Sequence, residues 1–270
     1  MLVLAAGQGT RMKSDLPKVL HPVLGRPMVR WVLDAVDALE PDSTVVVVGH
    51  GAEQVADVLP EGTATAVQHE QKGTGHATLI GLGAIDWSPG DSVVVVYGDV
   101  PLLTGETLAA TVGSLEASDS LAVVLAAEAQ DPTGYGRVVR NDDGSFVKIV
   151  EHKDASDAEL AVTEVNSGIY AFDAGHLAAT LPKLGTGNVQ GEYYLPDVCN
   201  AAPDRTIVAP IGYEEMSGVN THVELAAVSE IRRGRLLDDL MRSGVAIDDP
   251  ATTYVESTVS VAAGARLLPG

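Results

Sequence analysis

The stretch "LAAGQGTRMKSDLPKVLH", residues 4–21, decides how the fold of this chain is interpreted. It follows a short apolar start, and it joins a glycine-rich turn to several basic side chains. A glycine turn at the end of a strand lets backbone N–H groups approach an anion, because no Cβ atom obstructs them. In doubly wound α/β sheets ligands bind at this edge. The stretch therefore predicts an α/β fold with an anion site at its first turn.

The charge of the whole chain makes this basic cluster informative. The 270 residues include 17 Lys and Arg against 37 Asp and Glu, a net charge of −20. Such a surface repels nucleic acid and anionic membranes, so we expect neither as a partner. A negatively charged substrate needs local cations, which the opening segment supplies against Asp15 alone: Arg11, Lys13, Lys18, Arg26 and Arg30. The alternative is a solvated basic face, and the neighbouring glycines favour the anion site.

Cysteine content and hydropathy indicate the compartment. Cys199 is the only cysteine, which is typical of a reducing environment. No apolar run approaches the roughly 20 residues of a membrane span. We expect a soluble, cytoplasmic protein.

The first half of the chain has the pattern of a doubly wound α/β unit. Near-continuous Val-rich runs are typical of strands buried on both faces, and they occur at 2–7, 44–50, 64–68, 92–99 and 121–128. A helical pattern lies between them at 27–40, with Pro27 in its first turn. These features predict a largely parallel sheet covered by helices.

The pattern of alternating strands and helices changes from about Gly134 onward. Further strand-like pieces occur at 136–140, 146–151, 167–174 and 206–211. We interpret them as a smaller mixed lobe folded over the carboxyl edge of the sheet, with substrates bound between the two parts.

The C-terminal part predicts a connector helix and then a coil. Thr221 and Glu224 have capping-box spacing and Gly244 can end a helix, which predicts a helix over 221–243. Val255, Val261 and Leu267 then recur every six residues, the hexad pattern of a parallel β-helix. Stacked rungs need about three or more neighbours to bury a core, and the sequence holds only the first of them.

Two standard nucleotide motifs do not match the glycine turn. The dinucleotide fingerprint needs a third glycine where Met12 stands, and the Walker pattern needs Gly-Lys-Ser/Thr where the chain has Arg11-Met12. What remains is a turn carrying Arg11, with Lys18 returning to the same edge behind Pro17. Two cations above backbone amides suit a triphosphate whose leaving pyrophosphate must be neutralised.

A second constellation is "YGDVPLL", residues 97–103. Asp99 follows a buried strand, where α/β enzymes often hold a divalent cation, although a turn aspartate is the alternative. Mg²⁺ needs few protein oxygens, since water and phosphate complete its shell. The five histidines that invite a metal assignment lack helical ligand spacing with a third partner, and we interpret them as structural: His21, His50, His69, His76 and His152.

Eight segments of the chain resemble a known family. The segments that carry the resemblance, in order, are residues 4–21, "QKGTGHA", "YGDVPLL", "DPTGYGRVV", "IVEHKDA", "EVNSGIY", "QGEYYLPD" and "GVNTH". Together they resemble the uridyltransferase domain of the bacterial bifunctional N-acetylglucosamine-1-phosphate uridyltransferase/glucosamine-1-phosphate acetyltransferase family. The match covers residues 1 to about 242, and the hexads resemble the start of that family's left-handed β-helix.

The resemblance implies a fold and a domain organisation. It implies a Rossmann-like nucleotidyltransferase, a doubly wound mixed sheet with a smaller sugar-binding lobe, over 1–220. A connector helix follows at 221–243, and 244–270 begins the left-handed β-helix acetyltransferase domain.

The resemblance also implies site residues and Mg²⁺ as cofactor. Arg11 and Lys18 bind phosphates, and Asp99 with Asn220 holds the metal. Tyr97 lies beside the site. The other implied contacts are Leu4, Ala5, Ala6 and Gly7 for the nucleotide, Gln68, Gly73 and Thr74 for uracil, and Gly136, Glu151 and Asn166 for the amino-sugar.

The implied reaction is in-line attack by a phosphate oxygen of N-acetylglucosamine 1-phosphate on the α-phosphorus of UTP, releasing pyrophosphate. Alternatives are transfer to another sugar or from another base, an inactive sugar-nucleotide-sensing relative and, remotely, a nicotinamide oxidoreductase. Full-length relatives are implied to be trimeric through the β-helix. For this chain we expect a monomer without acetyltransferase activity.

Overall fold

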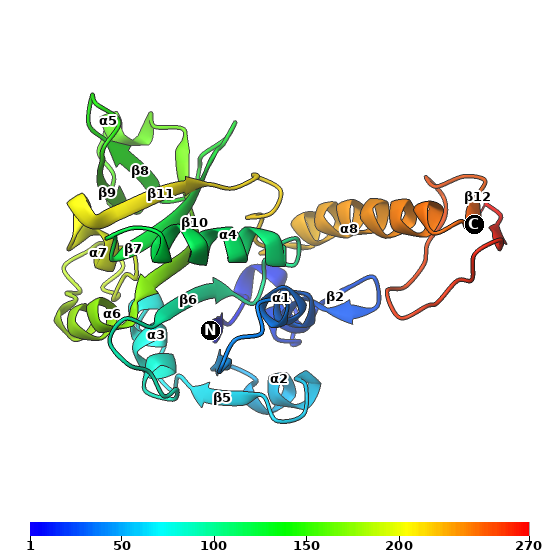
Figure 1. The fold of residues 1–270 in the computed structure, drawn as a ribbon, viewed down its shortest axis with the longest axis horizontal. Helices are drawn as coiled ribbons and strands as arrows, with labels where there is room; N and C mark the ends of the chain where they lie inside the picture. The colour runs from blue at the N-terminus through cyan, green and yellow to red at the C-terminus, as the bar shows by residue number, and fades with distance from the viewer. Residues whose placement is uncertain (270) are drawn as a thin grey trace.

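A mixed β-sheet forms the centre of the molecule in the computed structural model, which describes residues 1–269 (Figure 1). Its strand order is β11-β7-β10-β6-β1-β4-β5, and β8 pairs with both β10 and β9. The nine strands are β1 (Leu2–Ala5), β4 (Val45–Val48), β5 (Ala64–Val67), β6 (Ser92–Tyr97), β7 (Ala122–Glu128), β8 (Arg137–Arg140), β9 (Phe146–Val150), β10 (Glu164–Asp173) and β11 (Thr206–Pro210).

The four strands from β6 through β1 and β4 to β5 run parallel, as the Val-rich pattern predicts. Alternate residues of β1 enter different hydrophobic clusters: Val3 and Ala5 pack in one, Leu2 and Leu4 in the other. This period of two buries both faces of the sheet. The predicted α/β class and the five predicted strands of the first half are confirmed.

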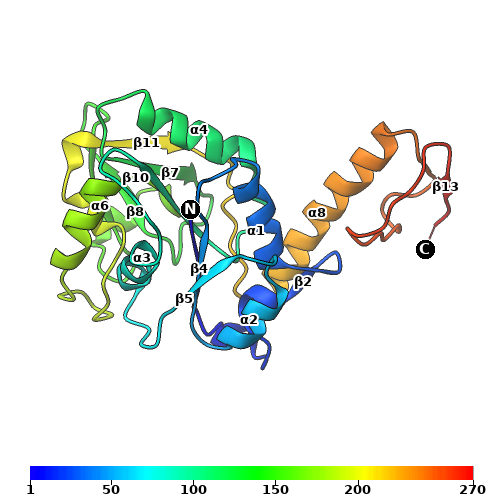
Figure 2. The same cartoon turned by 60° about the horizontal axis from the view of Figure 1, so that its bottom comes forward.

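Helices cover the two faces of the sheet (Figure 2). One face packs against α1 (Met28–Asp37), α2 (Ala52–Val58) and α4 (Gly105–Glu116), whose apolar side chains share a cluster with Val3. The other packs against α3 (Thr74–Leu82), α6 (Ala174–Thr180) and α7 (Asp197–Asn200). The helix predicted at 27–40 is α1, shorter at both ends.

The extent of the smaller lobe corrects the sequence prediction. β10 and β11, expected within that lobe, belong to the main sheet: β10 lies antiparallel between β6 and β7, and β11 runs parallel to β7. Only the β8–β9 hairpin with α5 (Asp157–Leu160) stands apart as a lobe, and it joins the sheet where Val165 of β10 pairs with Arg137 of β8. A buried apolar strand pattern does not encode its partner, so it cannot predict pairing across long sequence separations.

The predicted connector is α8 (His222–Arg242), which projects from the body in Figures 1 and 2. Its capping box is formed by Thr221 and Glu224, and Gly244 with φ of 97° follows its end, as expected. Beyond it, β12 (Ala246–Ile247) pairs in parallel with β13 (Arg266–Leu267). Two strands of two residues do not make a rung stack, so the β-helix stays a prediction.

Shorter elements complete the chain. The hairpin β2 (Pro22–Val23)–β3 (Arg26–Pro27) lies beside α8, and Ser257 N donates to Leu24 O in its turn at 3.0 Å. Within residues 1–269, four 3-10 helices lie at Thr10–Met12, Lys18–Leu20, Leu181–Lys183 and Pro203–Arg205.

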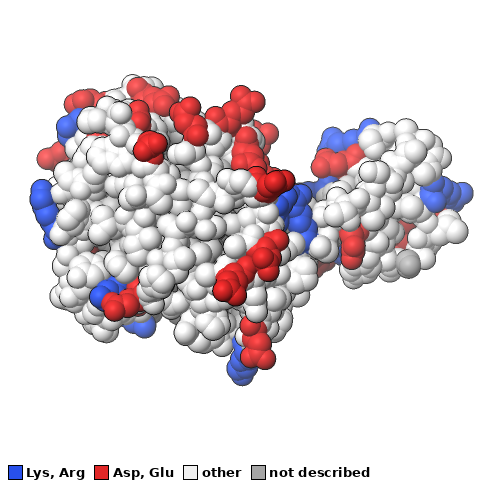
Figure 3. All heavy atoms as spheres, turned by 90° about the horizontal axis from the view of Figure 1, so that it is seen from below, with Lys and Arg blue, Asp and Glu red and all other residues white. Residues whose placement is uncertain are grey.

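Acidic side chains are prominent on the surface. Figure 3 shows Asp and Glu gathered along one edge of the body, with basic groups near the junction with the C-terminal segment. Over residues 1–269, no helix is long and apolar enough to cross a bilayer.

Candidate active site

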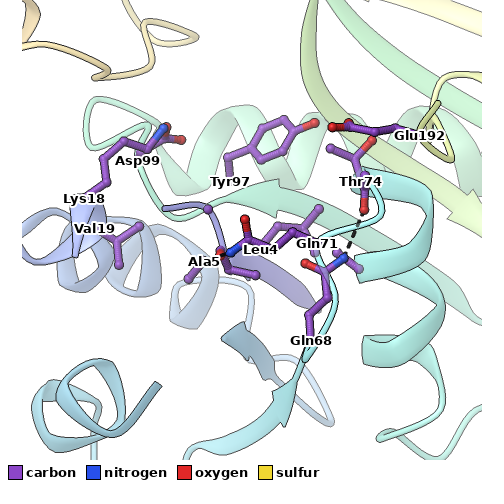
Figure 4. Close-up of a pocket in the computed structure, with 14 residues that line it drawn as sticks. Leu4, Ala5, Lys18, Val19, Gln68, Gln71, Thr74, Tyr97, Asp99 and Glu192 are labelled. Atoms are coloured by element: carbon purple, nitrogen blue, oxygen red, sulfur yellow. Dashed lines mark hydrogen bonds and ion pairs between the residues drawn. The ribbon is translucent and has the colours of Figure 1, made fainter. Parts of the chain in front are cut away.

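A cavity of about 260 Å³ opens at the carboxyl ends of β1, β5 and β6, the edge that the sequence predicts (Figure 4). Ten of the predicted site residues line it: Leu4, Ala5, Ala6, Gly7, Lys18, Gln68, Gly73, Thr74, Tyr97 and Asp99. Five other predicted residues do not line this cavity: Arg11, Asn220, Gly136, Glu151 and Asn166. They form two groups beside it.

The glycine turn after β1 serves two purposes. A Cβ atom on Gly7 would meet nothing within 4 Å, so the backbone there is open to a ligand. At Gly9, with φ of +64°, a Cβ would lie 2.6 Å from Lys18 Cβ. Glycine at this position therefore lets the Lys18 segment pass close to the turn.

The predicted phosphate and metal residues meet in one polar cluster. Lys18 Nζ donates to Asp99 Oδ2 and, at 3.1 Å, to Asn220 Oδ1. Arg11 donates to the same Asn220 oxygen at 2.8 Å, across 209 positions of sequence. In Figure 4 the Lys18 and Asp99 side chains lie together at one end of the cavity.

The N-terminus of α8 positions Asn220 in this cluster. Glu224 Oε2 accepts from the backbone N–H groups of Asn220 and Thr221, both at 2.7 Å. Val219 N donates to Asp99 O at 3.0 Å, which ties the start of the helix to the loop after β6. The connector helix thus holds a site residue in place.

The donor set of this cluster fits Mg²⁺. Asp99 and Asn220 offer a carboxylate and an amide oxygen, and both accept from one ammonium, so they surround a common point. Hard oxygen ligands suit Mg²⁺, which takes its other ligands from water and phosphate. Within the part of the chain that the structure describes, no group of three or more His, Cys, Asp or Glu side chains could hold a metal.

At another end of the cavity the Gln68 amide is held by the chain itself. Its Nε2 donates to Gly73 O at 3.2 Å and lies 3.1 Å from His76 Nδ1. These contacts fix the orientation of the amide. Gly73 has φ of +98°, and a Cβ there would lie 2.6 Å from Tyr193 O, so glycine permits this close approach.

The three residues expected at the amino-sugar also come together. A Cβ on Gly136 would lie 3.3 Å from Glu151 Oε1 and 3.5 Å from Asn166 Cβ. Asn166 Nδ2 donates to the Tyr170 hydroxyl at 2.7 Å. Burial raises the pKa of Glu151, and the carboxylates of Asp154, Asp197 and Glu192 add to the rise.

Tyr97 lines the cavity, at the end of β6. Burial raises the pKa of its phenol, and the charges of Glu151 and Asp99 add to that shift, so the hydroxyl stays neutral. Gly168, with φ of +79°, makes room for the ring, because a Cβ there would overlap Tyr97 Cε2. In Figure 4 the phenol points toward Thr74 and Glu192.

Comparison with known families agrees with this geometry. The family model "MobA-like NTP transferase domain" matches residues 1–163, which contain β1, the glycine turn and the loop of Asp99. This chain belongs to that family.

Three curated relatives, each named "Bifunctional protein GlmU", match the whole of this chain. The protein of Exiguobacterium sp. is 48% identical over 274 residues, that of Cutibacterium acnes 48% over 284, and that of Streptomyces coelicolor 47% over 279. The chain covers 60%, 67% and 58% of these relatives, respectively. It thus spans about three fifths of the length of the proteins it matches.

Two polar residues at this cavity are not among the residues predicted from the sequence. Gln71 lines the cavity and donates to Ala6 O at 2.7 Å, linking two loops of the site. Glu192 lines it as well, on a segment whose next residue, Tyr193, donates to Lys72 O at 2.8 Å. Both stand in segments that carry the resemblance, "QKGTGHA" and "QGEYYLPD", which is the signal that could have found them.

Proposed function

We propose that this chain transfers a uridylyl group from UTP to N-acetylglucosamine 1-phosphate. The products would be UDP-N-acetylglucosamine, a precursor for bacterial cell-wall synthesis, and pyrophosphate. The observation that carries the proposal is the joint position of Arg11, Lys18, Asp99 and Asn220 beside a cavity at the glycine turn.

The reaction asks for alignment and charge neutralisation rather than a nucleophilic side chain. A phosphate oxygen of the sugar phosphate attacks the α-phosphorus, and the bond to the pyrophosphate oxygen breaks. Arg11 and Lys18 balance the charge of the phosphates. Asp99 and Asn220 would hold Mg²⁺, which supplies further charge neutralisation when bound.

The remaining residues would choose the substrates. The Gln68 amide can donate to and accept from a uracil edge, and Gly73 lets its loop lie flat on the base. Glu151 and Asn166 offer acceptors and donors to sugar hydroxyls and to the acetamido group. A site built to bond an N–H strongly rejects analogues that lack it, because its polar groups are left unpaired.

The domain organisation is part of the proposal. We assign catalysis to residues 1–220, the connector to 221–243 and the beginning of a left-handed β-helix to 244–270. The names of the relatives and their identity over the whole chain support this division. A cytoplasmic location is proposed too, since free Cys199 is typical of a reducing compartment.

The test is an assay of the purified chain with UTP, MgCl₂ and N-acetylglucosamine 1-phosphate. We expect release of pyrophosphate and formation of UDP-N-acetylglucosamine, both abolished by a chelator. Glucose 1-phosphate, TTP and GTP in the same assay measure sugar and base choice. Faster turnover of one of these would overturn the substrate assignment, and UTP binding without turnover would favour an inactive sensing relative.

Matched variants test the residues. Asp99→Ala should lower kcat by about a thousandfold, since a lost metal ligand removes several kcal/mol of charge stabilisation. Asp238→Ala, an exposed aspartate of α8, is its control. Lys18→Ala should lower kcat/KM for UTP, whereas exposed Lys13→Ala in the same segment should not.

A further inference from the structure

Arg137 has a buried guanidinium group that belongs neither to the cavity nor to the polar cluster of Lys18 and Asp99. It is only 2% exposed, and its Nε has no hydrogen-bond partner in the described structure. No ion pair found within residues 1–269 includes it. Burying an unpaired charge is costly, so this arginine is a poor choice for stability alone.

The contacts of Arg137 join two segments of the amino-sugar group. Its Nη1 donates to Tyr135 O, the carbonyl that precedes Gly136. Its Nη2 lies 3.4 Å from Nδ1 of His152, the residue that follows Glu151 in the chain. The guanidinium therefore connects the loop before β8 to the turn after β9.

The backbone of Arg137 completes the arrangement. It pairs with Val150 of β9 on one side and with Val165 of β10 on the other. These partners immediately precede Glu151 and Asn166. Arg137 thus follows Gly136 in the chain, and its two backbone partners precede Glu151 and Asn166. Its side chain adds the contacts with Tyr135 O and His152 Nδ1.

We propose that Arg137 is a positioning residue for sugar recognition, which sets the distance between Gly136 and Glu151 by bridging Tyr135 O and His152. This rests on the proposed function, since it assigns that group to the sugar. Arg137 does not touch the reacting atoms, and it acts through the two segments that it holds.

Arg137→Met is the test variant, because methionine fills a similar volume without charge or donors. We expect the KM for N-acetylglucosamine 1-phosphate to rise about tenfold, the effect of one or two lost hydrogen bonds. The KM for UTP should stay unchanged, because the nucleotide residues lie on other loops. The melting temperature should be kept or raised, since replacing a buried charge with an apolar side chain is often neutral or stabilising.

Two further variants separate positioning from simple packing. Arg137→Lys keeps one donor within reach of Tyr135 O and should restore part of the sugar affinity. Arg140→Met lies in the same strand but removes an exposed pair with Glu164, and it should leave both KM values unchanged. His152→Ala should raise the sugar KM less than Arg137→Met, and the double variant should add nothing to Arg137→Met.

Calorimetric titration of the sugar phosphate into each variant, with steady-state kinetics, decides the outcome. An unchanged sugar KM in Arg137→Met overturns the inference, as does an equal rise in both KM values with a lower melting temperature. The wild-type chain tests the proposed function itself, which is wrong if that chain neither binds the sugar phosphate nor forms a nucleotide sugar. The inference about Arg137 would then be wrong as well.

Discussion

At the residue scale, Gly168 shows how one backbone conformation shapes the site. The residue has φ of +79°, and any Cβ there would overlap the Tyr97 ring. Tyr97 in turn lines the cavity. A glycine in the middle of β10 therefore costs strand propensity but lets an aromatic ring enter the sheet edge.

We predict that Gly168→Ala destabilises the chain by about 3 kcal/mol, combining left-handed strain with overpacking. Thermal or urea unfolding measures the change. Gly144→Ala is the control, because Gly144 has φ of +84° but a Cβ there would meet nothing within 4 Å. It should lose about 1 kcal/mol from strain alone. Equal losses in the two variants would mean that the Tyr97 contact contributes nothing.

Residue types and their positions in the sequence are enough to predict part of the site. Arg11, Lys18 and Asp99 stand out because charge beside a glycine turn or a strand end has few structural uses. Gln71 and Glu192 do not, since a neutral amide and a loop carboxylate are ordinary surface residues. Their place at the cavity depends on hydrogen bonds between segments far apart in sequence, from Gln71 to Ala6 O and from Tyr193, the neighbour of Glu192, to Lys72 O.

At the element scale, the existence of a strand is easier to predict than its pairing. Val-rich runs predict buried strands because both faces must be apolar, and β1, β4 and β6 follow this rule. β10 is just as buried over Val165–Phe172, yet it inserts antiparallel between β6 and β7. Its place depends on pairing with residues about 40 to 80 positions away, which no local periodicity records.

The element α8 holds two loops of the site. Arg232 lies 4.3 Å from the centre of the Trp31 ring, and its Nε and Nη2 donate to Pro101 O at 2.8 and 2.5 Å. Burial beside Arg235 lowers the pKa of this guanidinium to about 10. Pro101 stands two positions after Asp99, so the helix constrains the loop of Asp99 as well as Asn220.

We predict that Arg232→Met lowers stability by about 2 kcal/mol through the lost charge-assisted bonds and the ring contact. It should also lower kcat, because the loop of Asp99 loses its anchor. Denaturant unfolding and the uridylyl-transfer assay measure the two effects. Arg242→Met, exposed at the other end of α8, is the control and should change neither. Normal kcat in Arg232→Met would limit α8 to its role at Asn220.

The short helix α5 gives a pH dependence with a defined sign. Lys148 and the capping bonds from Ser156 lower the pKa of Glu159 to about 2. A carboxylate whose pKa is lowered in the folded state stabilises the fold at pH values above its unfolded pKa of about 4.5. This stabilisation is lost as the pH falls toward the folded pKa of about 2.

Glu159→Gln should therefore be less stable than wild type at pH 7, and the difference should shrink between about pH 4.5 and 2. Urea midpoints of both proteins across this range measure it. Lys148→Met should remove part of the same pH dependence, since Lys148 is the largest cause of the shift. A difference that stays constant down to pH 2 would show that the carboxylate charge is not the source.

At the scale of the whole molecule, the net charge of −20 and the local cation cluster work against each other. Acidic groups gather on the surface seen in Figure 3, whereas Arg11 and Lys18 face Asn220 and Asp99 at the cavity. Long-range repulsion of the proposed triphosphate substrate is screened by salt within about 10 Å, while direct contact with two cations is screened much less. Binding is therefore decided by the cluster rather than by the overall charge.

The C-terminal segment contacts the molecule at a different place from the contacts that hold the site. The loops of the site are held by the first half of α8, through Glu224 and Arg232. The segment after Ser243 meets the body elsewhere, through Ser257 N on Leu24 O and the contact of Glu256 with Gly25. We predict that a chain ending at Ser243 keeps the kcat and both KM values of the 270-residue chain.

Steady-state kinetics of the two chains test this, with circular dichroism to confirm that α8 stays folded. If the shorter chain instead loses activity, one set of contacts would explain the loss. Trp31 Nε1 donates to Val23 O in the β2–β3 hairpin at 3.0 Å, and the Trp31 ring carries Arg232. If the shorter chain loses kcat and a Ser257→Pro variant of the longer chain, which lacks the N–H that donates to Leu24 O, loses it equally, the C-terminal segment supports the loop of Asp99 through this hairpin, and residues 244–270 belong to the catalytic unit.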